Sequence, residues 1–416
     1  MIKTNQFIDL ISKHAIRFTD INDLQPLINK ASTAKYVLLG EASHGTSEYY
    51  TIRTEMTKKL IKEHGFSFIA VEGDWPACYE VNRYIKGMTS EYSSAVEVLK
   101  KSFNRWPSWM WANQEMVDLI EWLRSYNEKL EGDKVGFYGL DVYSLWESME
   151  AIVDYLEKIK SPNLAKALNA IECFEPFQRK PEQYGISAAF YGEDCMSEIL
   201  ELLQTIQHNK KTYDEDPEAS LNLKINAIAA SNAEHYYHTM VTNHNESWNI
   251  RDRHMTEVLH YIGNHYGTDV KGIVWEHNTH IGDARATDMA SEGMVNVGQL
   301  TREQYGEKDI YAIGFGTYKG TVIAADKWGA KAEVMSIPNG APGSWEEVVH
   351  KAGAFNKYFM FTEENKNYFN EILGHRAIGV VYHPQYEHHG NYVPSRVSDR
   401  YDGYIHVEET KALTPL

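Results

Sequence analysis

Short apolar segments rich in β-branched and aromatic residues recur along this chain, and they constrain its fold more than any other feature. Seven such segments occupy residues 36–40, 66–71, 135–140, 272–275, 310–315, 377–382 and 404–407. Their nearly continuous hydrophobicity is typical of strands that are covered on both faces, as in a parallel or mixed sheet between layers of helices. The pattern therefore predicts an α/β fold.

Between these segments, apolar residues recur at steps of three and four, as in residues 116–123, which predicts amphipathic helices. From about residue 144 to 264 strand patterns nearly vanish and helical patterns follow one another. We predict a single domain, residues 1–416, whose central mainly parallel or mixed sheet is flanked by helices. A helical subdomain at about 144–264 is expected to form an insertion or cap beside an open cleft, with an exposed loop at 208–219.

Composition narrows the classes of partner. The chain has 416 residues, 43% of them hydrophobic, and 58 acidic against 41 basic side chains give a formal charge of −17. This charge repels nucleic acid and anionic lipid, so we expect neither as a partner. No run of 18 apolar residues and no leader pattern occurs. Cys78, Cys173 and Cys195 form an odd set without a pairing pattern, which predicts reduced thiols and a cytoplasmic location.

Polar side chains follow four of the predicted strands at the point where each ends. They are Glu41 and His44, then Glu72 and Asp74, then Asp141, and finally Glu276, His277 and His280. In open α/β sheets the ligand crevice lies beyond the carboxyl ends of the strands, so we expect these groups to converge on one cleft. A strand-end carboxylate can equally cap the following helix, and for Asp74 and Asp141 that alternative stays open.

Two kinds of catalysis compete with simple water activation. A serine nucleophile is disfavoured because no G-x-S-x-G segment occurs, and Ser43 lies next to His44, where adjacent side chains point apart. A metal site remains an alternative, because carboxylates and imidazoles are suitable ligands for a divalent transition metal. The candidate set would be Glu41, His44, Glu72, His277 and His280, although neither H-E-x-x-H nor a cysteine-rich zinc spacing is present.

General-base hydrolysis is the third possibility. An unperturbed imidazole has a pKa of about 6.5, so a neutral His44 can take a proton from water at neutral pH. Glu41 or Glu72 could hold the other ring nitrogen of that histidine. Arg53, nine residues after His44, could steady a carboxylate or an oxyanion, or it could be a surface arginine in a salt bridge.

Several motifs resemble the erythromycin esterase family. They are G-E-A-S-H-G-T at residues 40–46, then Arg53, V-E-G-D-W-P at 71–76, and W-E-H-N-T-H-I-G-D-A-R at 275–285, supported by E-S-W-N-I-R-D-R-H-M at 246–255 and N-V-G-Q-L at 296–300. The supporting segments are most similar to a broad bacterial branch of that family, sometimes labelled succinoglycan biosynthesis proteins. The resemblance covers the chain from about Tyr36 onward.

The resemblance implies a metal-independent esterase without a cofactor, in which an essential histidine acts as general base. By motif, that histidine matches His44, while Glu41, Arg53, Glu72, His277 and His280 match the other members of the site. The expected substrate is a small-molecule carboxylic ester or macrolactone, and a macrolide antibiotic would make the chain a resistance enzyme. A metal-dependent hydrolase using the same cluster and a non-catalytic ligand-binding protein are the alternatives.

Overall fold

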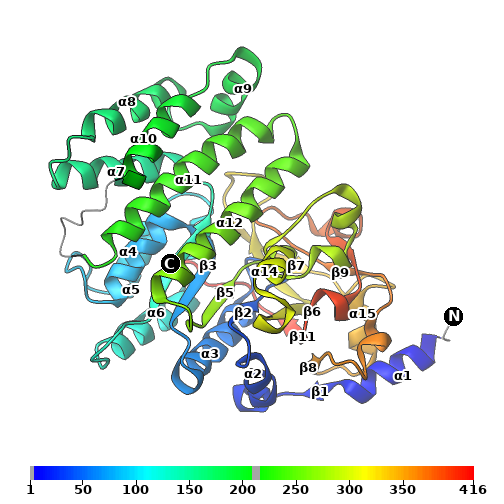
Figure 1. Cartoon of the computed structure of the whole chain (residues 1–416). Helices are drawn as coiled ribbons and strands as arrows, with labels where there is room; N and C mark the ends of the chain where they lie inside the picture. Colours follow the sequence, from blue (N-terminus) through cyan, green and yellow to red (C-terminus); the bar gives the residue numbers. More distant parts are fainter. Residues whose placement is uncertain (1–3, 209–215) are drawn as a thin grey trace. The chain divides into compact units, whose positions relative to one another are not determined.

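A computed structural model describes residues 4–208 and 216–416 of the chain (Figure 1). The chain divides into two compact units that interleave in sequence. The first unit contains Met1–Ile69, Glu91–Val135 and Asp269–Leu416, and the second contains Ala70–Ser90 and Gly136–Thr268. The single domain expected from the sequence stays a prediction.

The fold is α/β, with a mixed, mainly parallel sheet of nine strands, as predicted. In the first unit the strand order is β1-β8-β11-β6-β2-β5, with β7 paired to β6, and β3 and β4 complete the nine. The strands are β1 (Ile16–Arg17), β2 (Tyr36–Leu39), β3 (Phe68–Asp74), β4 (Gly136–Asp141), β5 (Gly272–Trp275), β6 (Ile310–Ala324), β7 (Glu333–Ile337), β8 (Lys357–Met360) and β11 (Gly403–Thr410). A separate antiparallel pair joins β9 (Leu373–Arg376) to β10 (Tyr392–Ser395).

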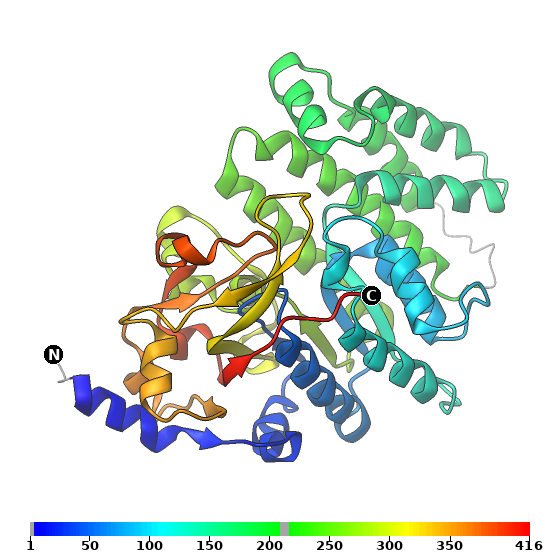
Figure 2. The same ribbon diagram turned by 180° about the vertical axis from the view of Figure 1, so that it is seen from behind.

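Helices surround the sheet of the first unit. They are α1 (Thr4–His14), α2 (Gln25–Ala31), α3 (Ser47–His64), α5 (Ala95–Ser102), α6 (Gln114–Asn127), α13 (Asn278–Ile281), α14 (Val297–Tyr305), α15 (Trp345–Lys351), α16 (Glu387–Gly390) and α17 (Val397–Arg400). Figure 2 shows the same elements from behind. The α6 helix confirms the amphipathic pattern predicted at residues 116–123.

The second unit is mostly helical. Besides β4 and most of β3 it contains α4 (Trp75–Ile85), α7 (Leu145–Lys158), α8 (Leu164–Phe174), α9 (Pro181–Tyr191), α10 (Met196–His208), α11 (Ala219–Met240) and α12 (His244–Tyr266). The helices α7 to α11 share an apolar core that includes Trp146, Phe174 and Tyr184. This region confirms the helical insertion predicted at about 144–264. Most of the loop predicted at 208–219 lies outside the described residues.

The polar residues that follow the central strands lie at one edge of the sheet. Strand β2 lies between β5 and β6 and pairs in parallel with both, so that Leu39 is opposite Trp275 and Ile313. All four residues of β2 and of β5 are buried, as expected for strands covered on both faces. Because parallel neighbours end at the same edge, the segments that follow β2 and β5 emerge side by side.

Two expectations about strands need correction. Residues 377–382 form no strand; only Ile378 and Val381 make isolated bridges there, to Ser43 and Ala325. Strand β6 extends nine residues beyond the predicted apolar segment and pairs with β7 in this extension. Its first eight residues are buried, the next four are half-buried and the last three are buried again. Hydrophobicity therefore marked only the beginning of the strand.

The cysteines also differ from expectation. A disulfide bond joins Cys173, in α8, to Cys195, just before α10, so the prediction of reduced thiols is wrong for these two residues. The two cysteines are 22 residues apart in the sequence, and α9 with its turns brings them together in the fold. This proximity depends on helix packing, so the spacing alone did not predict the pair. Cys78 is free and buried. The cysteines therefore no longer support a cytoplasmic location, and no helix in residues 4–208 or 216–416 is long and apolar enough to cross a membrane.

One buried amine makes the stability of the first unit sensitive to pH. Lys357 is fully buried in β8, with its Nζ 3.8 Å from Glu408 Oε2. Burial lowers the pKa of this lysine from 10.5 to about 8, and Glu408 only partly opposes the shift. The unfolded chain therefore binds more protons than the folded chain between pH 8 and 10.5, so this group adds stability as the pH rises through that window.

We predict that Lys357→Met stabilises the protein at pH 7, because the variant no longer buries a charged amine. The free energy of unfolding should rise by at most about 3 kcal/mol at pH 7. The difference between the variant and wild type should shrink between pH 8 and 10.5. Urea unfolding across this pH range measures the effect, with exposed Lys331→Met as the control. A difference between Lys357→Met and wild type that does not change with pH would contradict the assignment.

Candidate functional site

The segment that leaves β2 holds a carboxylate and an imidazole in contact. Glu41 Oε1 lies 2.9 Å from His44 Nδ1, and both residues are buried, with 10% of the histidine side chain exposed. Two glycines allow the backbone to pack this closely. A Cβ at Gly40 would lie 2.2 Å from Asn278 Oδ1, and one at Gly45 would lie 1.9 Å from the Ile323 carbonyl oxygen. The Glu-x-x-His segment is therefore wedged against its neighbours on both sides.

Arg53 holds the other oxygen of the same carboxylate. This residue is fully buried on α3, and its Nη2 donates to Glu41 Oε2 at 2.5 Å. Its guanidinium carbon lies 4.6 Å from the ring centroids of Tyr50 and Trp275, one contact from its own helix and one from β5. The Glu41 carboxylate therefore has one oxygen on the imidazole and the other on the guanidinium.

The hydrogen bond at Nδ1 defines the chemistry of His44. An ionised carboxylate only accepts hydrogen bonds, so His44 Nδ1 is the protonated nitrogen of the neutral ring. Nε2 then carries the lone pair that can accept a proton.

His277 has the opposite arrangement. As the N-cap of α13, its Nδ1 accepts from the Thr279 backbone N–H at 3.3 Å and lies 2.8 Å from Thr279 Oγ1. In the neutral ring the proton is then on Nε2, which makes His277 a donor at that atom. The centroids of the His44 and His277 rings are 4.9 Å apart. His280 is buried three residues later on the same short helix.

Asn278 ties the strand ends of this site together. Its backbone N–H donates to the Glu41 carbonyl oxygen at 2.8 Å, and its carbonyl oxygen accepts from Arg400 Nη2 at 3.0 Å. Its side chain donates to the Phe315 carbonyl oxygen at 2.7 Å and accepts from the Phe315 N–H at 3.1 Å. One fully buried amide thus connects the segments after β2 and β5 to β6.

We predict that Asn278→Ala destabilises the first unit by about 2–5 kcal/mol, because two buried backbone groups of Phe315 lose their partner and a cavity forms. Urea unfolding followed by fluorescence measures the loss. Asn370→Ala removes an exposed amide from the same unit and should change stability by less than about 0.5 kcal/mol. Equal stability of Asn278→Ala and wild type would show that the hydrogen bonds between the Asn278 side chain and Phe315 are not needed for stability.

The second unit contains its own polar cluster. Arg251, on α12, binds Asp141 through both carboxylate oxygens, at 2.8 and 2.7 Å, and its Nη2 also donates to Glu72 Oε1 at 2.7 Å. The Tyr143 ring lies 4.9 Å from the guanidinium carbon. Burial lowers the pKa of the neighbouring His254 to about 4, so this histidine is neutral at physiological pH. The contact with Arg251 Nη2 makes Glu72 an ion-pair partner of that arginine.

The predicted site residues fall into these two groups. Glu41, His44, Arg53 and His277 form one connected cluster in the first unit, and His280 lies on the same helix as His277. Glu72 belongs to the second unit. Among the described residues, no group of three or more histidine, cysteine, aspartate or glutamate side chains is arranged to hold a metal ion.

Sequence reasoning assigned no role to three residues whose side chains make buried hydrogen bonds or ion pairs in the structure. Asn278 lies inside the W-E-H-N-T-H segment and Arg251 inside E-S-W-N-I-R, so each lay within a quoted motif without a chemical role of its own. The third, Glu234, lies on α11, where it is fully buried and accepts from Tyr184 Oη at 2.6 Å. A buried, hydrogen-bonded carboxylate has no distinguishing signal in a helical sequence.

Comparison with known proteins decides the family. The family described as erythromycin esterase matches residues 61–410. The chain belongs to the erythromycin esterase family. The matched range begins after Glu41, His44 and Arg53, so the family match by itself does not include that cluster.

Relatives of this erythromycin esterase family member are distant. The putative hydrolase YbfO of Bacillus subtilis (strain 168) is 22% identical over 407 residues, covering 93% of this chain and 86% of that protein. Erythromycin esterase type II of Escherichia coli is 22% identical over 379 residues, covering 82% and 84%. The crystal structure of a succinoglycan biosynthesis protein superposes with a TM-score of 0.76 at 19% identity, covering 99% and 98%. This structural likeness supports the fold.

Proposed function

We propose that this protein hydrolyses a carboxylic ester or lactone by general-base activation of water at His44. The observation that carries the proposal is the hydrogen bond between His44 Nδ1 and Glu41 Oε1, which leaves Nε2 as the basic nitrogen. The His44 side chain is 10% exposed, and the proposal requires that a water molecule and a substrate carbonyl reach its ring.

The proposed reaction has two steps. The water oxygen attacks the carbonyl carbon while its proton passes to His44 Nε2, which gives a tetrahedral oxyanion and an imidazolium. The oxyanion then collapses, the bond to the leaving oxygen breaks, and the imidazolium returns the proton to the departing alkoxide. The products are a carboxylic acid and an alcohol, which remain one molecule when the substrate is a lactone.

Glu41 and Arg53 are positioning residues in this proposal. The carboxylate fixes the tautomer and orientation of His44 and stabilises the imidazolium that forms. Arg53 keeps the carboxylate in place, because the guanidinium is itself held by buried contacts with two aromatic rings. His277 supports the reaction as a donor through Nε2, because a preformed donor stabilises the developing oxyanion more than the neutral carbonyl. His280 and Glu72 carry no assigned step.

The proposed substrate is a small molecule, and macrolide lactones are the first class to test, because a distant relative bears the name erythromycin esterase type II. A resistance role is part of the proposal only if a macrolide is hydrolysed.

We predict that His44→Ala lowers the turnover of any hydrolysed ester by about 10²–10⁴-fold, because the variant lacks the positioned base. Glu41→Gln should also lower it, since the amide has one acceptor oxygen for two donors, His44 Nδ1 and Arg53 Nη2, and no longer stabilises the imidazolium. Mass spectrometry of macrolide lactones and aryl esters, scoring a gain of one water, measures turnover. Exposed His389→Ala is the matched control and should behave as wild type.

Turnover by wild type should survive a chelator. Loss of activity on chelation with recovery on adding a divalent metal would overturn the metal-free mechanism. Near-normal turnover by His44→Ala would overturn the assignment of the base.

A further inference from the structure

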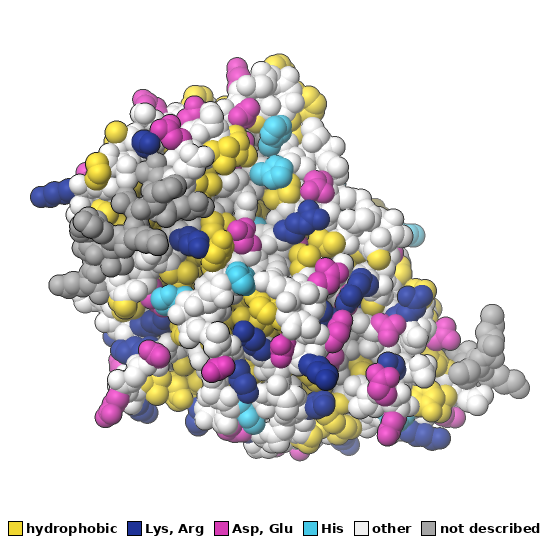
Figure 3. All heavy atoms as spheres, in the orientation of Figure 1, with side chains coloured by type: hydrophobic (Ala, Val, Ile, Leu, Met, Phe, Trp, Pro, Cys, Tyr) yellow, Lys and Arg dark blue, Asp and Glu magenta, His cyan; other side chains and the backbone are white. Residues whose placement is uncertain are grey.

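The first unit contains a cavity of about 420 Å³ that the proposed reaction does not use. It is lined by residues that follow α13, by α14 and by the segments after β8 and before β11. Both signs of charge are present, with three basic and five acidic side chains in the lining. The face drawn in Figure 3 likewise has basic and acidic side chains interspersed. A cavity of this size fits a small molecule, and its mixed charge disfavours a polyanion.

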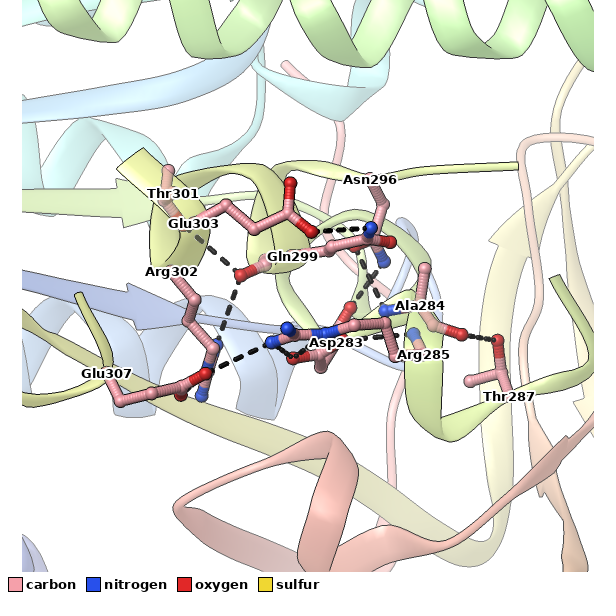
Figure 4. A network of polar contacts seen from close by, with 12 residues as sticks. Asp283, Ala284, Arg285, Thr287, Asn296, Gln299, Thr301, Arg302, Glu303 and Glu307 are labelled. Atoms are coloured by element: carbon pink, nitrogen blue, oxygen red, sulfur yellow. Dashed lines mark hydrogen bonds and ion pairs between the residues drawn. The ribbon is translucent and has the colours of Figure 1, made fainter. Parts of the chain in front are cut away.

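Two arginines in this cavity hold one exposed carboxylate. Arg285 Nη2 lies 3.1 Å from Glu307 Oε1, and Arg302 Nε lies 3.1 Å from Glu307 Oε2. Figure 4 shows both guanidinium groups beside Glu307. The Glu307 side chain is 68% exposed, whereas that of Arg302 is only 4% exposed. Glu307 is thus the most exposed member of the contact, Arg285 has 46% of its side chain exposed, and Arg302 is buried.

Other contacts hold the two arginines in place without Glu307. Arg302 donates to Asp402 Oδ2 at 2.6 Å and to the Gly298 carbonyl oxygen at 3.3 Å. Arg285 binds Asp283, with Nη2 to Oδ2 at 2.6 Å. Because these contacts remain when Glu307 moves away, the pair stays directed at the space that Glu307 occupies. Two such guanidinium groups form a recognition site for a carboxylate.

The cavity also carries negative charge that is not neutralised. Asp399 lines it, is exposed, and makes no ion pair with any described residue. Lys366, the remaining basic residue of the lining, is already paired with Glu363 at 2.7 Å. A ligand that brings a carboxylate alone would therefore meet uncompensated negative charge, whereas one that also carries an ammonium group would neutralise it.

We propose that this cavity binds a small zwitterion. Its carboxylate replaces that of Glu307 between Arg285 and Arg302, and its ammonium group faces Asp399. Amino acids and short peptides have this chemistry. The site is independent of ester hydrolysis, and its test does not use that activity.

Three matched probes separate the contributions of the two charges. They are β-alanine, which carries both charges, propionate, which lacks the ammonium group, and propylamine, which lacks the carboxylate. Ligand-observed NMR titrations of the full chain at constant ionic strength should show saturable binding of β-alanine. Propionate should bind about tenfold more weakly, and propylamine should not saturate. Equal binding of all three probes, or saturation by none, would overturn the proposal.

Variants place the binding in this cavity. Glu307→Gln removes the competing charge and should tighten β-alanine binding about tenfold, whereas Arg285→Gln should abolish it. Asp399→Asn should weaken β-alanine binding but leave propionate unaffected or bound more tightly. Exposed Glu333→Gln, on β7, changes the net charge as Glu307→Gln does and should leave every affinity unchanged.

Two outcomes would refute this location. One is β-alanine binding that is the same in Arg285→Gln as in wild type. The other is an equal gain in Glu307→Gln and Glu333→Gln, which would show a general charge effect. Thermal unfolding of each variant confirms that it is folded.

Discussion

The carboxylate of Glu41, shared between an imidazole and a guanidinium, is the interaction on which the account of this site depends. One oxygen contacts His44 Nδ1 and the other accepts from Arg53, and all three side chains are at least nine-tenths buried. A buried carboxylate is costly unless it is paired, and here both of its oxygens have a fixed partner. Orientation of the histidine and burial of the acid are therefore one arrangement.

The sheet makes this arrangement possible. Parallel pairing of β2 with β5 and β6 brings three chain segments to one edge, and Asn278 joins them through its backbone and its side chain. The same pairing places Trp275 where its ring contacts Arg53. The position of His277 relative to His44 is thus a consequence of strand register, with the short α13 helix beginning directly after the strand.

Much of this fold follows from hydrophobic pattern. Buried strands such as residues 36–39 and 272–275 are apolar because both of their faces are covered. The sequence pattern therefore predicted where these strands end, and the polar residues just beyond the ends are Glu41, His44 and His277. Pairing between distant side chains was not visible. The disulfide of Cys173 with Cys195 depends on how helices pack, and the choice of Glu41 over Glu72 as the partner of His44 Nδ1 depends on side-chain direction. Neither is encoded in a local pattern.

The most direct test of the account is the tautomer of His44, which two-dimensional NMR of the 15N-labelled imidazole reads from the shifts of its two ring nitrogens. The account requires a neutral ring protonated at Nδ1, with Nε2 unprotonated, because Glu41 accepts at Nδ1. Assignment rests on the signal that disappears in His44→Ala. A neutral ring protonated at Nε2 would contradict the account, because the nitrogen assigned to water activation would then carry no lone pair.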